Sequence, residues 1–159
     1  MNNIFLLLLN LSILILIGKY INDLKSDRTL VIVLALFGMT CLGIILTRTF
    51  QTPLFINIGY VVGLILSPIL FSIYLLKQKG DKKESVIRRL MLIPALTLFT
   101  MYLLKALHLP VYGVLYFMMI ISVLLGGWIV IKKPELKEIQ PFQIILIFLI
   151  VDVLSFFSN

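Results

Sequence analysis

Asp152 is a carboxylate in an otherwise apolar part of the chain, and it is the side chain best placed to do chemistry. An isolated charge in hydrocarbon costs roughly 2.5 to 3.5 kcal/mol on insertion scales. We therefore expect Asp152 either to pair with a cation or to line a water-filled cavity. Lys105 is the first candidate for its partner, and Arg48 is the second.

Other polar residues fall at a similar depth in their apolar segments and complete a candidate ligand-binding set. The set comprises Asn10, Arg48, Asn57, Lys105, His108 and Asp152. One interpretation is structural: a Lys105 to Asp152 pair holds the ends of the helices together. The other is an outward-facing pocket, in which the cations bind an anionic lipid headgroup, a peptide carboxylate or a small solute.

Catalysis has little support in the residue inventory. The chain has one His, one Cys and only one carboxylate inside an apolar segment. It therefore lacks a nucleophile with a matching base, paired carboxylates for acid and base catalysis, and a His-rich or Cys-rich site for metal or haem. We predict no catalytic residue, no bound metal and no cofactor.

Six apolar segments account for most of the sequence. Each is close to the ~20 residues that an α-helix needs to cross ~30 Å of hydrocarbon. We predict an all-α integral membrane protein, a polytopic bundle that forms one domain over residues 1–159, with helices at about 4–21, 30–47, 54–76, 90–107, 111–131 and 142–158.

The cations alternate between the gaps that separate these segments. The first, third and fifth gaps hold twelve of the 14 Lys and Arg residues, and the other two hold Arg48 and Lys105. Cytoplasmic loops retain Lys and Arg during insertion, so the positive-inside rule places the odd gaps in the cytoplasm and both termini outside. The six loop carboxylates lie among these cations, where we expect them to be solvated: Asp23, Asp27, Asp81, Glu84, Glu135 and Glu138.

Composition agrees with a membrane location. The sequence is 61% hydrophobic, and the net charge of +7 comes from cations beside helix ends. Such cations meet anionic lipid headgroups, so we expect membrane lipids as partners and no nucleic acid. The expected location is a plasma membrane of the bacterial type.

Small residues mark the expected contacts between helices. Gly59, Gly63 and Ser67 recur every four residues and form a smooth stripe that a neighbouring backbone can approach closely. The neighbour could belong to this bundle or to a second copy of the chain. Pro68 and Pro94 each remove a hydrogen bond inside an expected helix, and we expect them to kink it.

These patterns favour a protein that works by contact. The expected role is an accessory, scaffold or immunity-type subunit that binds another membrane protein, or itself, through its helices. The alternative is a small transporter or solute-binding membrane subunit that uses the outward-facing polar pocket.

The charge asymmetry gives a topological prediction. In a Cys41→Ser background, single cysteines at Asn2, Thr52 and Asn159 should react with an impermeant thiol reagent added to intact cells. A cysteine at Gly80 should react only after the cells are opened. Labelling of Gly80 from outside would show that the orientation is wrong.

Overall fold

The computed structural model describes residues 3–50, 59–78, 81–109, 113–133 and 135–157, apart from the side chains of a few residues within helices. These residues form helices and contain no strand. The elements are α1 (Asn3–Asp23), α2 (Arg28–Phe50), η1 (Tyr60–Leu66), α4 (Ser67–Lys77), α5 (Lys82–Ala106), α6 (Gly113–Lys132) and α7 (Ile139–Phe157). The predicted all-α fold class is confirmed. Helices suit an apolar solvent because their backbone hydrogen bonds are internal.

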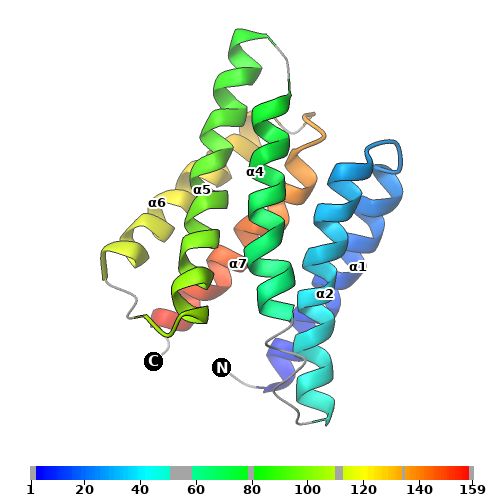
Figure 1. Ribbon diagram of the computed structural model, residues 1–159, viewed down its shortest axis with the longest axis vertical. Helices are drawn as coiled ribbons and strands as arrows, with labels where there is room; N and C mark the ends of the chain where they lie inside the picture. The colour runs from blue at the N-terminus through cyan, green and yellow to red at the C-terminus, as the bar shows by residue number, and fades with distance from the viewer. Residues whose placement is uncertain (1–2, 51–58, 79–80, 110–112, 134, 158–159) are drawn as a thin grey trace.

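The helices form an up-and-down bundle (Figure 1). The turns from α1 to α2, from α4 to α5 and from α6 to α7 lie at the upper end of the view, where we also find most cations. We call this the basic end. The first turn of α1 and the last turn of α7 lie at the opposite end. Three helices in the described part are long and apolar enough to cross a membrane, within Arg28–Thr47, Lys82–Ala106 and Gly113–Lys132.

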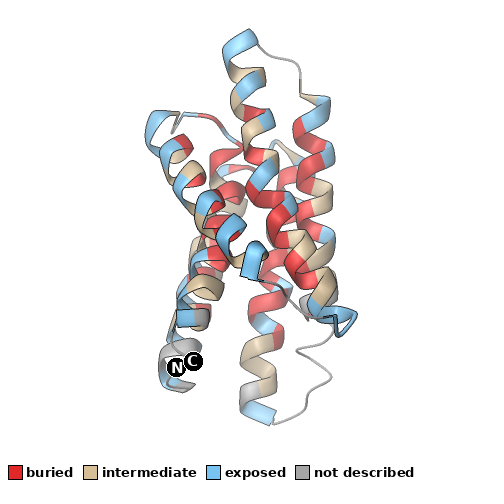
Figure 2. Cartoon of the chain, turned by 90° about the vertical axis from the view of Figure 1, so that its left-hand side faces the viewer, coloured by how far each residue is buried: buried red, intermediate tan, exposed pale blue. Residues whose placement is uncertain are grey.

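The core centres on α7, which contacts α1, α2, α5 and α6. Phe148 stacks on Phe37 of α2 with ring centroids 5.7 Å apart, and Phe142 stacks on Phe71 of α4 at 6.4 Å. Figure 2 shows the buried residues concentrated along the inner faces of the helices. Helix α7 therefore lies between α1 and α2 on one side and α5 and α6 on the other.

Helix α6 lies at the periphery and contacts α5 and α7. A hydrogen bond between the hydroxyls of Thr97 and Ser122, 3.0 Å apart, joins it to α5 in the buried interior. Its outer face exposes large apolar side chains, including Val114, Phe117, Leu124 and Ile131. This face has the character of a surface in contact with lipid or another protein.

The small-residue stripe faces α2. Gly59, Gly63 and Ser67 are buried, and the Thr40 hydroxyl of α2 donates a hydrogen bond of 2.9 Å to the Gly59 carbonyl. A Cβ atom at Gly63 would lie 1.4 Å from Thr40 Oγ1 and 2.7 Å from the Leu36 carbonyl oxygen. Only glycine fits at this crossing as the backbones now stand.

Pro68 coincides with a change in helix type. The chain is a π-helix over Tyr60–Leu66 and an α-helix from Ser67 onward, with Pro68 at its start. Because proline has no N–H, it cannot donate the usual bond to the residue four positions earlier. Pro94 instead lies within α5, which continues over Lys82–Ala106 without a break in helix assignment.

Helix α5 begins at Lys82, well before the expected start at residue 90. The apolar segment marks the part suited to hydrocarbon, whereas the helix continues through Lys, Glu and Arg, which are good helix formers. Glu84 and Arg88 are also one turn apart and form an ion pair, with Nη2 to Oε2 at 3.3 Å. The first two turns of α5 are therefore polar helix rather than loop.

The Gly63 crossing gives a stability prediction. Gly63→Ala should lower the free energy of unfolding in detergent by about 1 to 3 kcal/mol, as is typical of overpacking. Gly127→Ala is the matched control, because a Cβ there meets no atom within 4 Å. Thermal unfolding of both variants checks this. Equal melting curves for Gly63→Ala and the parent protein would contradict the close crossing.

Candidate functional site

The expected partner of Asp152 lies beside it. Lys105 Nζ, from the last turn of α5, is 3.0 Å from Asp152 Oδ1 on α7. The lysine also lies over the Tyr102 ring, 4.5 Å from its centroid. Its side chain is 39% exposed and that of Asp152 is 14% exposed. Asp152 Oδ2 is buried and has no hydrogen-bond partner among the described residues.

Of the other members of the candidate set, the structure describes the side chains of His108 and Asn10. His108 is exposed just beyond α5, where its φ of 53° allows the chain to turn away. Asn10 is buried on α1. Asn57 and the side chain of Arg48 lie outside the described part of the chain. Of the proposed pocket, the structure therefore shows the Lys105 to Asp152 ion pair, with the Tyr102 ring beside the lysine.

A second polar cluster at the basic end joins the start of α2, helix α4 and the connection between α6 and α7. Asp27, in the turn before α2, accepts a 2.5 Å hydrogen bond from the Tyr74 hydroxyl of α4. Asp27 Oδ2 is also 2.7 Å from Lys137 Nζ, in the connection between α6 and α7. Its other oxygen accepts a long bond of 3.4 Å from the Leu30 N–H, in the manner of an N-cap. One carboxylate thus contacts three separate segments.

The electrostatics of this cluster favour its charged form. Burial alone would raise the pKa of Asp27, but hydrogen bonds from Lys137, Tyr74 and the Leu30 backbone together lower this pKa below its usual value. The hydrogen bond with Asp27, with the Tyr74 hydroxyl nearby, raises the pKa of Lys137. Both groups are therefore ionised at neutral pH, and the contact is ionic.

Two further contacts extend this cluster along α1. The Tyr20 hydroxyl donates a hydrogen bond to Gln143 Oε1, and Gln140 Nε2 lies 3.4 Å from Asp23 Oδ2. Both glutamines are on α7, so the basic ends of α1 and α7 are joined by polar groups. The expectation of a freely solvated loop is wrong for Asp27, which lies in this network.

The most buried charges among the described residues are those of Arg88 and Glu138, and Glu138 is one of the six loop carboxylates expected to be solvated. Glu138 is fully buried and Arg88 is 8% exposed. Arg88 Nε donates to Glu138 Oε1 at 3.0 Å, and this bond joins α5 to the residue that precedes α7. Arg88 Nη1 and Glu138 Oε2 are buried without a hydrogen-bond partner among the described residues. The solvated-loop expectation is therefore wrong for Glu138.

The helical register contains a signal for this burial. Once α5 is extended to Lys82, Arg88 shares a face with the buried residues Met91, Ala95 and Leu98, whereas Arg89 is exposed. That spacing predicts a core-facing arginine. It does not identify Glu138 as the partner, because nothing local links positions 50 residues apart.

These contacts can bind and orient, and they bring no set of reactive groups together within the described residues. Groups of three or more His, Cys, Asp or Glu able to hold a metal ion are absent from that part of the chain. Cys41 is buried on α2. The polar contacts described above are ion pairs and hydrogen bonds.

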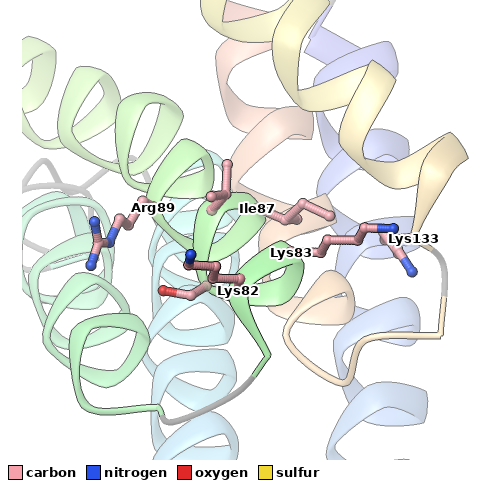
Figure 3. A pocket seen from close by; sticks show the side chains of 7 residues that line it. Lys82, Lys83, Ile87, Arg89 and Lys133 are labelled. Carbon is pink, nitrogen blue, oxygen red and sulfur yellow. The ribbon is translucent and has the colours of Figure 1, made fainter.

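Two cavities adjoin the first turns of α5 at the basic end. One, of about 660 Å³, lies toward α6 and has Lys83, Ile87 and Lys133 among its lining residues (Figure 3). The other, of about 190 Å³, lies toward the end of α4 and includes Arg88 and Gln78. An open groove of about 370 Å³ lies between α1, α6 and α7. Comparison with protein families, curated proteins and solved structures found no match to this chain.

The buried ion pair gives a prediction for stability. Glu138→Gln should cost up to about 3 to 5 kcal/mol of unfolding free energy, because it leaves the buried Arg88 charge with only the more exposed Glu84 as a counter-ion. Replacing both residues, as Arg88→Met with Glu138→Leu, should recover much of the loss. Chemical unfolding in detergent measures both effects.

The exposed pair between Lys133 and Glu135, 3.2 Å apart, supplies the matched control. Glu135→Gln removes the same charge from a solvated position and should leave the unfolding curve unchanged. If Glu138→Gln were as stable as Glu135→Gln, the Arg88 to Glu138 contact would not be a buried ion pair.

Proposed function

We propose that the chain crosses a bacterial-type plasma membrane six times, with both termini on the extracytoplasmic side. Three helices suited to crossing a membrane support this placement, as does the common end shared by the cation-bearing turns. The basic end then faces the cytoplasm, and the Lys105 to Asp152 pair lies toward the outer surface.

We further propose that the protein is a non-catalytic subunit that binds another membrane protein through its helices. The observation that carries this proposal is the groove between α1, α6 and α7. Its lining is mainly apolar and includes Leu16, Val130 and Ile147, with Gly127 among them. A Cβ at Gly127 would have no neighbour within 4 Å, so a foreign helix could approach this backbone closely.

The ion pairs within the chain also support a contact role for the groove. Asp27, Glu138 and Asp152 are each engaged by a cation from another segment of the same chain. Their ion pairs hold helices in place, so they serve the bundle itself. An apolar groove then remains as the surface best suited to a partner.

The partner proposed is a transmembrane helix of a different protein. Glycine in a groove lowers the distance of closest approach between helices and favours van der Waals packing, which is the main attraction available in lipid. A partner with a small-residue face would fit best. The experiment must distinguish this partner from a second copy of the same chain.

Affinity purification from native membranes tests the proposal. The tagged chain should recover one membrane protein at a fixed ratio, and Gly127→Leu should reduce that recovery at least fivefold without altering the melting temperature. Gly113→Leu is the matched control, because Gly113 is also open but lies at the far end of α6.

Other outcomes point away from a helix-binding subunit. Equal recovery with Gly127→Leu would show that the groove is not the contact surface. Recovery of a differently tagged copy alone would indicate a homo-oligomer. Saturable thermal stabilisation by a small anion, lost in Lys105→Gln, would instead support the solute-binding alternative.

A further inference from the structure

The 660 Å³ cavity at the basic end combines two chemically different surfaces. It lies between the first turns of α5 and the end of α6. Its rim carries four cations, Lys82, Lys83, Arg89 and Lys133, and its wall includes the side chains of Val86 and Ile87. A ligand that fills it must therefore offer both negative charge and apolar surface.

The cations of the rim come from two helices. Figure 3 shows Lys83 of α5 and Lys133, at the end of α6, extending toward one another across the mouth of the cavity. Like charges that approach in this way repel, and an anion between them would remove the repulsion. The arrangement is thus complementary to a single anionic group.

Few carboxylates compensate this charge. Lys133 is 3.2 Å from Glu135, in an exposed pair. Within the described residues Lys82, Lys83 and Arg89 form no ion pair, and Glu84 and Glu138 both pair with Arg88. The α5 N-terminus adds the positive end of a helix dipole. The mouth of the cavity is therefore net positive.

The apolar wall identifies the class of ligand. Val86 is 54% exposed although its neighbours in the lining are cations. An apolar side chain left exposed among charged groups is suited to contact with another apolar group. A free phosphate would gain nothing from this wall, because it has no apolar surface. A phospholipid would place its phosphate at the cations and an acyl chain along the wall, and basic pockets between helices are known to bind such headgroups.

We propose that this cavity binds an anionic phospholipid, with its phosphate between Lys83 and Lys133 and an acyl chain against Val86 and Ile87. The proposal rests on the membrane placement above but not on the partner groove, since the two surfaces share no lining residue. It assigns to one defined site the lipid contact that is expected more generally of cations beside helix ends.

Native mass spectrometry in detergent tests the proposal with phosphatidylglycerol as the probe. The test variant is Lys83→Gln with Lys133→Gln, and the matched control is Lys25→Gln with Lys132→Gln. The control lysines are exposed at the same end but outside the cavity. The test variant should bind phosphatidylglycerol roughly 10- to 30-fold more weakly than the parent, since each juxtamembrane cation contributes about fivefold. The control should retain most of its affinity.

Two further arms separate a lipid site from a general attraction for anions. Val86→Trp places a bulky ring against the apolar wall without changing the charge of the cavity, and it should also weaken phosphatidylglycerol binding. Phosphatidylcholine, which is zwitterionic, and soluble glycerol 3-phosphate should bind the parent protein at least tenfold more weakly than phosphatidylglycerol. Melting temperatures of all variants show whether each is folded.

Several outcomes would overturn the inference. Equal losses in the test and control variants would show a diffuse surface effect rather than a site. Tight binding of phosphatidylcholine would remove the role of the cations. The apolar wall would have no role if glycerol 3-phosphate bound as tightly as the lipid. The same conclusion would follow if Val86→Trp bound the lipid as tightly as the parent protein.

Discussion

The buried ion pair between Arg88 and Glu138 is the constraint on which the arrangement of the basic end depends. A charge taken from water must find a counter-charge, so the start of α5 and the start of α7 cannot separate without a large cost. This contact sets where α7 enters the bundle. From that point the Phe142 and Phe148 rings reach α4 and α2, and the core forms around the helix that contacts most of the others.

The two ends of the bundle use electrostatics differently. At the basic end, Asp27 and Glu138 draw together turns that are distant in sequence, and their ion pairs work beside polar partners such as Tyr74. At the opposite end, Lys105 and Asp152 form a partly exposed pair that joins the last turn of α5 to α7. Between the ends, helices meet through small residues and hydroxyls, as at Gly63 and Thr40. Charge therefore positions the helix ends, and close packing sets the distances between the middle parts.

Sequence patterns predicted the helical class and the approximate extent of the described helices, because apolar length and turn composition are local properties. They also suggested Lys105 as the partner of Asp152, since a charge in an apolar segment has few possible counter-ions. The start of α5 was misplaced because an apolar segment marks membrane depth and not the end of a helix. The Glu138 contact could not be predicted, because it depends on how two distant turns meet in three dimensions. The ligand-binding role of the outer set stays a prediction.

The position of Glu138 has a consequence for how the protein is made. Helix α7 follows the other described helices in the chain, yet it occupies the centre of the bundle. During synthesis, Arg88 therefore leaves the ribosome 50 residues before its counter-ion does. Until then its charge would remain at the water-facing surface, where Glu84 can accompany it. The contacts of α7 with α1, α2, α5 and α6 can form only once α7 has been made, so a nascent chain that ends before Glu138 lacks the buried ion pair that fixes the basic end.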